Sequence, residues 1–245
     1  MAFQTERNTM TGASAELAQV DVGLRQYMLG VYNYMASGVA LTGLVALLVA
    51  NTSLQRLFYV QTAHGPQPSI LTWGAMLVSI GIVFFLSFRV AKMSAPAVQG
   101  TFWAYATLNG IWLSSIFMVY TDASIARVFF ITAASFAGLS LYGYTTRRDL
   151  TAMGSFMMMG LIGILIASLV NMFLASSALD FAVSVIGVIV FAGLTAYDTQ
   201  KVKEMYWEAD GHDVVAKTSV MGALTLYLDF INLFLMLLRF FGDRR

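Results

Sequence analysis

Long apolar segments separated by short polar stretches dominate the pattern of this chain. A transmembrane helix needs about 17 to 25 predominantly apolar residues to cross the hydrocarbon core of a bilayer. Seven segments meet this requirement, at residues 28–50, 70–88, 97–120, 128–144, 152–174, 181–197 and 220–241. The three prolines, Pro66, Pro68 and Pro96, all fall between these segments. The pattern predicts an all-α integral membrane protein with seven transmembrane helices.

Composition agrees with this prediction and excludes several classes of function. The chain is 58% hydrophobic and 11% charged, whereas soluble domains are about 25% charged. A net charge of +1 provides no basic face for nucleic acid. Cysteine is absent, and the two histidines, His64 and His212, are not spaced as metal ligands. We therefore expect no cofactor, no resident transition metal and no cysteine nucleophile.

The first 27 residues differ from the rest because they are polar and include Glu6, Arg7, Glu16 and Asp21. They do not resemble a cleavable signal, since no short apolar stretch follows a basic start. We interpret residues 1–27 as a polar cytoplasmic tail and residues 28–242 as one seven-helix bundle. The chain has no room for a second soluble domain.

The distribution of basic residues predicts the orientation in the membrane. With seven crossings, nine of the 14 Lys and Arg residues lie on the side of the N-terminus. These are Arg7, Arg25, Arg89, Lys92, Arg147, Arg148, Lys201, Lys203 and Lys217. Because cytoplasmic loops are enriched in Lys and Arg, the N-terminus is predicted to be cytoplasmic and the C-terminus outside. The basic C-terminal end, with Arg239, Arg244 and Arg245, leaves an alternative in which the last segment re-enters the membrane instead of crossing it.

Asp229 lies in the middle of the last apolar segment, with no other charge for nine residues on either side. A charge at the centre of a span costs about 2.5 to 3.5 kcal/mol on insertion scales, so such a residue is a functional-site hypothesis by default. A helical stripe with spacings of three and four contains Gly222, Thr225, Asp229, Asn232, Met236 and Arg239. We expect this polar seam to face a cavity, with the last helix in the middle of the bundle. The alternative is that Asn, Thr or Tyr groups satisfy a structural Asp229 and hold helices together.

Asp198 is a second carboxylate, at the end of the sixth apolar segment. Considered alone, it suits an interfacial residue that pairs with Lys201 one turn later. Asp229 lies about 13 Å beyond the start of its own segment, at 1.5 Å per residue. The two carboxylates meet only if the sixth helix continues past Lys201 or if a vestibule is recessed into the membrane. Both arrangements fit the sequence.

Several motifs resemble those of the Bax inhibitor family of membrane proteins. The last segment, 226–234 followed by 238–242, resembles the signature of the family. Residues 197–200 (Tyr-Asp-Thr-Gln) resemble its sixth-helix motif, residues 148–151 with Gly154 resemble the start of its fifth helix, and residues 31–42 resemble its first helix. The resemblance covers nearly all of the chain after residue 24.

Membership in this family implies a seven-helix fold whose last helix is central and is enclosed by two groups of three. It also implies that Asp198 and Asp229 form a proton-sharing pair that gates a pH-sensitive calcium leak, with the ions bound only transiently. An arginine of the second helix is expected to contact the pair, and Arg89 matches it best, with Lys92 as a rival. Proteobacterial relatives are associated with control of a membrane-anchored quality-control protease, so an interaction protein of the plasma (inner) membrane is the alternative function.

The chemistry of two carboxylates fits such a gate. Two carboxylates that share a site resist being ionised together, so the pair titrates as a unit. With one proton they form a charge-assisted hydrogen bond between two helices, and without it they repel and present the hard oxygen ligands that calcium prefers. The expected latch therefore loosens as the pH rises.

An enzyme is a weaker interpretation of the same two residues. Intramembrane aspartyl proteases also use two carboxylates, as general acid and general base on a water molecule. Here Tyr227 and Leu228 precede Asp229 where a glycine is expected, and no Pro-Ala-Leu segment follows. We therefore expect no catalytic activity.

The predicted orientation can be tested in a bacterial host. A reporter that is active only in the cytoplasm should give a signal when it is fused to the N-terminus or inserted between Thr199 and Thr218, because nine of the 14 basic residues lie on that side. A reporter at the C-terminus should be silent. A periplasmic location for either of the first two sites would contradict the assignment.

Overall fold

The computed structural model describes residues 2–62 and 65–245, with side-chain environments from residue 22 onward. The main helices are α1 (Ala2–Asn51), α3 (Ile70–Arg89), α4 (Ala95–Leu113), α6 (Asp122–Thr145), α7 (Thr151–Leu174), α8 (Ser177–Glu204) and α9 (His212–Phe241). In the described part of the chain, seven helical stretches are long and apolar enough to span a membrane. The predicted all-α, seven-helix class is confirmed.

Short elements join the long helices. They are α2 (Gln55–Phe58), β1 (Tyr59–Thr62), β2 (Gly65–Pro68), η1 (Val90–Lys92) and α5 (Ile116–Val119). The strands β1 and β2 pair antiparallel, with Tyr59 opposite Pro68. The hydroxyl of Tyr59 donates to the carbonyl oxygen of Trp112 at 3.2 Å, so this connection is held against the end of α4. The hairpin was not predicted from the sequence.

Several helices extend beyond the apolar segments that predicted them. The sixth segment, 181–197, lies within α8, which begins at Ser177 and ends at Glu204. The hydroxyl of Ser176 accepts a hydrogen bond from the Leu179 N–H, which caps the start of this helix. Helix α1 continues backward to Ala2, so most of the predicted polar tail forms the N-terminal part of the first helix. Apolar periodicity marks the membrane-embedded length of a helix, and polar residues continue the same helix into water.

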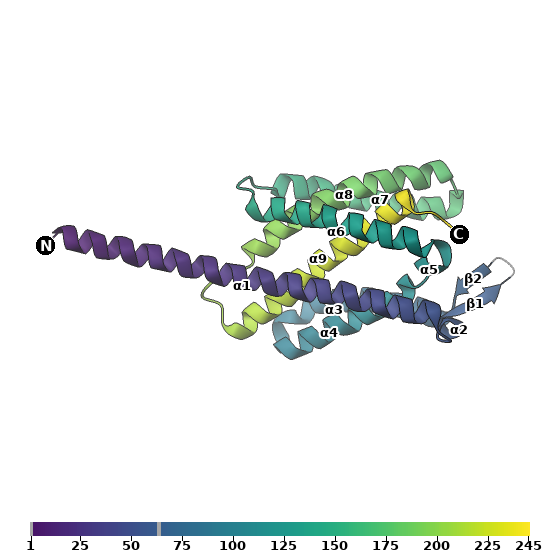
Figure 1. Ribbon diagram of the computed structural model, residues 1–245, viewed down its shortest axis with the longest axis horizontal. Helices are drawn as coiled ribbons and strands as arrows, with labels where there is room; N and C mark the ends of the chain where they lie inside the picture. The colour runs from purple at the N-terminus through teal and green to yellow at the C-terminus, as the bar shows by residue number, and fades with distance from the viewer. Residues whose placement is uncertain (1, 63–64) are drawn as a thin grey trace.

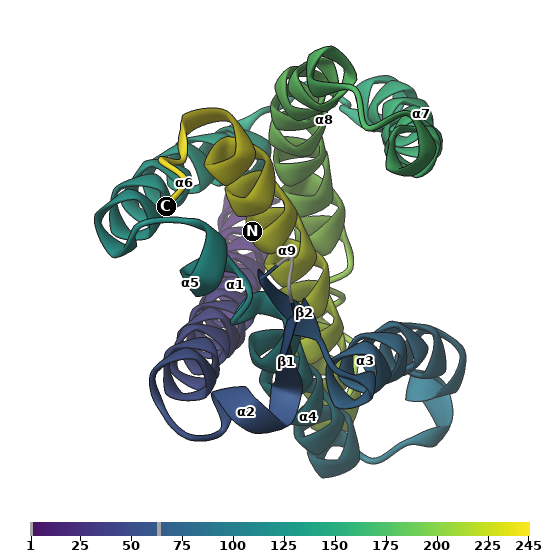
Figure 2. The same cartoon turned by 90° about the vertical axis from the view of Figure 1, so that its right-hand side faces the viewer.

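Helix α9 occupies the middle of the bundle. It packs against α1 and α4 on one side and against α6 and α8 on the other, while α3 packs on α4 and α7 on α8. Figure 2 shows α9 between these two groups of three helices. α9 is the most buried of the spanning helices and α7 is the least. The expected arrangement, a central last helix enclosed by two groups of three, is confirmed.

A buried hydrogen-bond network connects α9 to the first group of helices. Tyr227 of α9 forms a 2.7 Å hydrogen bond with the hydroxyl of Thr42 and accepts one of 3.0 Å from the amide of Asn109. Asn109 in turn accepts a 2.5 Å hydrogen bond from the indole N–H of Trp112. Polar groups in an apolar bundle must be satisfied within the protein, and each such bond contributes about 0.6 to 2 kcal/mol. The network therefore fixes α9 against α1 and α4.

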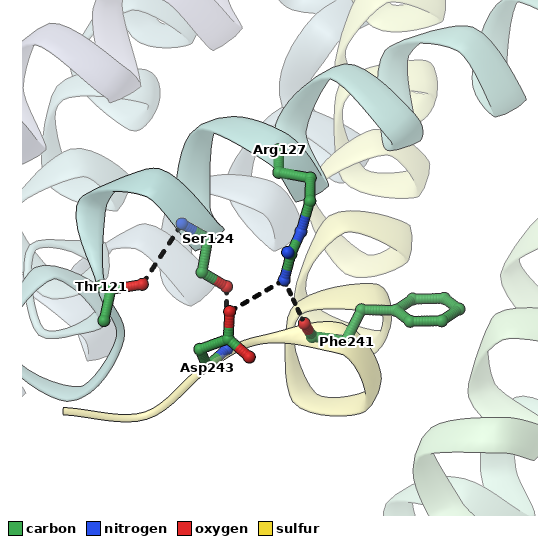
Figure 3. A network of polar contacts seen from close by, with 5 residues as sticks. All are labelled: Thr121, Ser124, Arg127, Phe241 and Asp243. Atoms are coloured by element: carbon green, nitrogen blue, oxygen red, sulfur yellow. Dashed lines mark hydrogen bonds and ion pairs between the residues drawn. The ribbon is translucent and has the colours of Figure 1, made fainter.

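The C-terminal residues 242–245, which we call the clasp, fold back over the start of α6 (Figure 3). The backbone N–H of Thr121 donates to the carbonyl oxygen of Asp243, and the N–H of Asp243 donates to the hydroxyl of Ser124. The side chain of Arg127 forms a 3.0 Å ion pair with Asp243. The clasp lies at the opposite end of the bundle from the N-terminus (Figure 1). α9 therefore runs from one end of the bundle to the other, which favours a complete crossing over the re-entrant alternative.

Carboxylates neutralise most of the basic residues at the clasp end of the bundle. Arg127 pairs with Asp243, and Arg245 pairs with Asp122 at 2.7 Å. Two further arginines, Arg239 and Arg244, approach Asp180 at 3.9 and 3.8 Å. Each exposed pair contributes at most about 1 kcal/mol to stability. Their main consequence is that the basic C-terminal cluster, which made the orientation ambiguous, is paired where it lies.

Helices α6 and α8 approach each other closely at Gly143. A β-carbon added to Gly143 would lie 2.2 Å from the carbonyl oxygen of Ala196 in α8. A β-carbon added to Gly138, in the same helix, would meet no described atom of a neighbouring element within 4 Å. The backbones can pack at this distance only because residue 143 has no side chain.

Substitution of these two glycines by alanine should separate packing from helix propensity. Gly143→Ala should destabilise the bundle by about 1 to 3 kcal/mol through overpacking. Gly138→Ala should be neutral or stabilise by up to about 1 kcal/mol, since alanine favours helix. Thermal unfolding of the two variants in the same detergent would measure the difference. Equal melting temperatures would contradict the close contact between α6 and α8.

Candidate functional site

The carboxyl groups of Asp198 and Asp229 meet where α8 packs against α9. They lie within hydrogen-bonding reach of each other. Asp229 is only 5% exposed, and Asp198 is partly buried. Of the two arrangements that the sequence allowed, the structure has the continuous helix, because α8 runs past Lys201 to Glu204. Lys201 exerts an electrostatic attraction on Asp198 from one turn further along the same helix.

One oxygen of this aspartate pair has no donor from the protein. Among the described residues, Asp229 Oδ2 is buried and has no hydrogen-bond partner. The alternative of a structural aspartate satisfied by Asn, Thr or Tyr is therefore not observed for this oxygen. Two carboxyl groups can form a hydrogen bond only if one of them is protonated, and a shared proton also removes the cost of burying two charges. The geometry thus favours a pair that holds one proton and can release it.

Three members of the polar seam, Gly222, Asp229 and Met236, pack along α8. A β-carbon on Gly222 would lie 2.7 Å from Val202 of α8, and one on Gly187 of α8 would lie 2.5 Å from the sulfur of Met236. The aspartate pair lies between these two contacts. Small residues therefore allow α8 and α9 to approach closely on both sides of the pair.

The other seam residues have different surroundings. The hydroxyl of Thr225 donates to the Met221 carbonyl oxygen at 3.2 Å, within its own helix. Arg239 lies at the clasp end and approaches Asp180. Asn232 lines a cavity of about 370 Å³ between α3, α4 and α9, together with Ser79 and Asn109. Of the predicted seam residues, only Asn232 lines this cavity. Gly222, Asp229 and Met236 lie along one edge of the stripe, toward α8, and Thr225, Asn232 and Arg239 lie along the other edge.

The motif at residues 197–200 contacts three neighbouring elements. The ring of Tyr197 covers Gly154 of α7, where a β-carbon would lie 2.4 Å from the ring. The hydroxyl of Thr199 is 3.0 Å from that of Ser140, which is 2.7 Å from that of Tyr32. These contacts hold α8, and Asp198 with it, against α7, α6 and α1.

Gln200 fixes the connection between α6 and α7. Its Oε1 accepts the Leu150 N–H, and its Nε2 donates to the Arg148 carbonyl oxygen, both at 2.9 Å. In the same connection, the side-chain hydroxyl and the backbone N–H of Thr151 donate to Asp149, and both hydrogen bonds lower the pKa of that exposed carboxyl. The sequence motif at 148–151 is therefore a docking segment for Gln200. Sequence reasoning assigned no role to Gln200, Thr199 or Tyr227, although polar residues inside apolar helices were a signal that could have found them.

The structure does not bring a cation of the second span to the aspartate pair. Arg89 is exposed at the end of α3, and Lys92 is exposed in η1. Within residues 22–62 and 65–245, neither side chain has a hydrogen bond or an ion pair with the two aspartates. The contact between Arg89 and the pair stays a prediction.

The aspartate pair is too small to be a resident metal site by itself. No group of three or more His, Cys, Asp or Glu side chains gathers in the described residues. Asp198 and Asp229 together offer four carboxylate oxygens, whereas calcium takes about six to eight oxygen ligands. A calcium ion at the pair would need water or other oxygens to complete its shell, which suits transient binding.

A family model and several bacterial relatives match this chain over most of its length. Residues 24–245 match the model of the family described as inhibitor of apoptosis-promoting Bax1. The chain is 48% identical over 235 residues to the inner membrane protein YbhL of Escherichia coli K12, covering 95% of this chain and 97% of that protein. An uncharacterized protein of Rickettsia prowazekii is 51% identical over 227 residues, which is 92% of either chain. An uncharacterized membrane protein of Streptococcus pyogenes serotype M3 is 38% identical, over 91% of this chain and 95% of that protein.

Proposed function

The chain belongs to the Bax inhibitor family of integral membrane proteins, and on that premise we propose that it is a pH-sensitive calcium leak channel gated by Asp198 and Asp229. The observation that carries this proposal is the meeting of two carboxyl groups at the centre of the bundle, one of them with a buried oxygen that no described protein donor reaches. An ionisable residue inside a span is commonly part of an ion or proton path. Because the relative from Escherichia coli is named an inner membrane protein, we place this chain in the bacterial plasma membrane.

In the closed state one proton is shared by the aspartate pair. The hydrogen bond joins α8 to α9 and is flanked by the tight contacts of Gly222 with Val202 and of Gly187 with Met236. These contacts keep the two helices close together on both sides of the pair. The closed state is favoured at low pH, where the shared proton is retained.

Loss of this proton opens the gate. Two unit charges about 4 Å apart repel by about 4 kcal/mol at an effective dielectric constant of 20. That is comparable with the free energy of several interhelical hydrogen bonds, so it can separate α8 from α9 and admit water. Calcium then meets two carboxylates, whose oxygens are the hard ligands that it prefers.

The proposed gate predicts the pH dependence of calcium flux. In dye-loaded proteoliposomes, wild-type flux should rise with pH through a midpoint at about pH 6 to 8, because protons leave a shared carboxyl site in that range. Asp229→Asn should make flux low and nearly independent of pH, because it removes the ionising group at the deepest point. Asp198→Asn should also flatten the profile but leave a larger residual flux. If Arg89 competes for the pair, Arg89→Ala should shift the midpoint without abolishing it.

Asp180→Asn is the matched control, because it changes a partly exposed carboxylate at the other end of α8 and should keep the wild-type profile. Flux that retains the wild-type pH profile in both Asp198→Asn and Asp229→Asn would show that the pair is structural and that gating resides elsewhere.

A second candidate function is modulation of a membrane-anchored protease through protein contact. The observation that favours it is the length of α1, which runs from Ala2 although its apolar segment begins only at Met28. About 26 helical residues, or about 39 Å, therefore precede the apolar segment. Figure 1 shows this part of α1 projecting away from the bundle. A projecting helix offers a partner a surface that does not depend on the gate.

Deletion of residues 2–20 should separate the two functions. If the projecting helix is the contact, the deletion should abolish the effect on the protease in cells while liposome flux stays at the wild-type level, since the bundle is unchanged. Blots of the membrane fraction would control for expression. Loss of flux and of the cellular effect together, at equal expression, would contradict separable roles.

A further inference from the structure

A long groove separates α1 from α6, two helices that both flank α9 but make few contacts with each other. Its volume is about 750 Å³, within the range of roughly 300 to 1,000 Å³ typical of sites for small molecules. The walls include Ala36 and Ala40 of α1 and Ala133 and Ala137 of α6, and Phe230 of α9 lies between them. Four small side chains at helical spacing leave the space open. We call it the α1–α6 groove.

The groove is as long as a lipid chain requires. Its lining on α1 runs from Arg25 to Ala40, which corresponds to about 22 Å along a helix. One leaflet of the hydrocarbon core is about 15 Å thick. A second cavity of about 410 Å³ shares Val39, Phe129 and Phe230 with it and continues toward the other side of the membrane. The groove and the second cavity together therefore extend from the N-terminal membrane face past the middle of the bilayer.

The end of the groove at the N-terminal membrane face is basic. Arg25 lines it and is exposed, and within the residues whose side chains are described it has no ion pair. Lys203 donates a 2.9 Å hydrogen bond to the carbonyl oxygen of Tyr144, another lining residue, and lies 5.2 Å from the centre of its ring. No acidic residue lines this groove in the described part of the chain. Apolar walls below two cations match a molecule with a long apolar chain and a negative head.

We propose that the α1–α6 groove binds an anionic phospholipid of the leaflet on the N-terminal side. One acyl chain lies between the alanines of α1 and α6, and the phosphate binds Arg25, with Lys203 adding positive charge. A guanidinium group suits this role because its planar N–H donors match the oxygens of a phosphate. A lipid in this position also contacts Ser140, which is hydrogen-bonded to Tyr32 of α1 and to Thr199 beside Asp198. The site is separate from the aspartate pair and does not depend on the proposed gating.

Native mass spectrometry of the full chain tests the headgroup. Protein released from detergent with equal amounts of phosphatidylglycerol and phosphatidylethanolamine should retain phosphatidylglycerol preferentially. Arg25→Gln should lower this preference about fivefold, the effect of one basic residue at an anionic membrane surface. Lys92→Gln, which removes an exposed cation on the same face but outside the groove, should keep the wild-type preference.

A second pair of variants tests the walls. Ala137→Phe fills the groove and should reduce retention of both lipids, whereas Ala134→Phe, on an exposed part of α6 outside the groove, should not. Equal retention of the two lipids by wild type, or equal losses in Arg25→Gln and Lys92→Gln, would overturn the proposal. Equal retention in Ala137→Phe and Ala134→Phe would overturn it as well. If Ala137→Phe does not fold, the two charge variants alone decide the outcome.

Discussion

Inside this apolar bundle, polar groups can form hydrogen bonds only with one another. The arrangement of α9 follows from that constraint. Inside the bundle an unpaired polar group costs several kcal/mol, since water is not available to replace a lost hydrogen bond. Tyr227 meets the requirement through Thr42 and Asn109, which hold α9 to the first group of helices. Asp229 lies about half a turn further on and faces α8, where the carboxyl group of Asp198 is its partner. The same helix is thus fixed on one face by neutral hydrogen bonds and on another by a contact that depends on a proton.

This difference gives the two faces of α9 different behaviour. The Tyr227 network contains no group that ionises near neutral pH, so it is expected to persist as the pH changes. The contact between Asp198 and Asp229 is the one that a proton can make or break. Around Asp198, the residues Tyr197, Thr199 and Gln200 attach α8 to α7, α6 and the connection between them. A change at the aspartate pair therefore acts on α8 together with α6 and α7, which are attached to it. α9 stays attached to α1 and α4.

Much of the fold could be predicted from the sequence because a helix needs a minimum apolar length to cross a membrane. Seven apolar segments predicted the seven helices, and the polar seam of the last segment, together with the family resemblance, predicted the central position of α9. The ends of α8 and α9 were less predictable, since the helices continue through polar residues where apolar periodicity stops. The meeting of Asp198 with Asp229 depended on that continuation past Lys201. The packing of the seam on α8, the role of Gln200 and the clasp at residues 242–245 depend on tertiary contacts, which residue spacing within one helix does not specify.

Infrared spectroscopy of the protein in lipid nanodiscs tests directly whether Asp198 and Asp229 share a proton. Wild type at neutral pH should show the carbonyl band of a protonated carboxyl group, shifted in heavy water and lost as the pH rises. The band should be absent or altered in both Asp198→Asn and Asp229→Asn, because either substitution removes one half of the pair. A wild-type spectrum without a protonated carboxyl at neutral pH, or a band unaffected by both substitutions, would contradict the account.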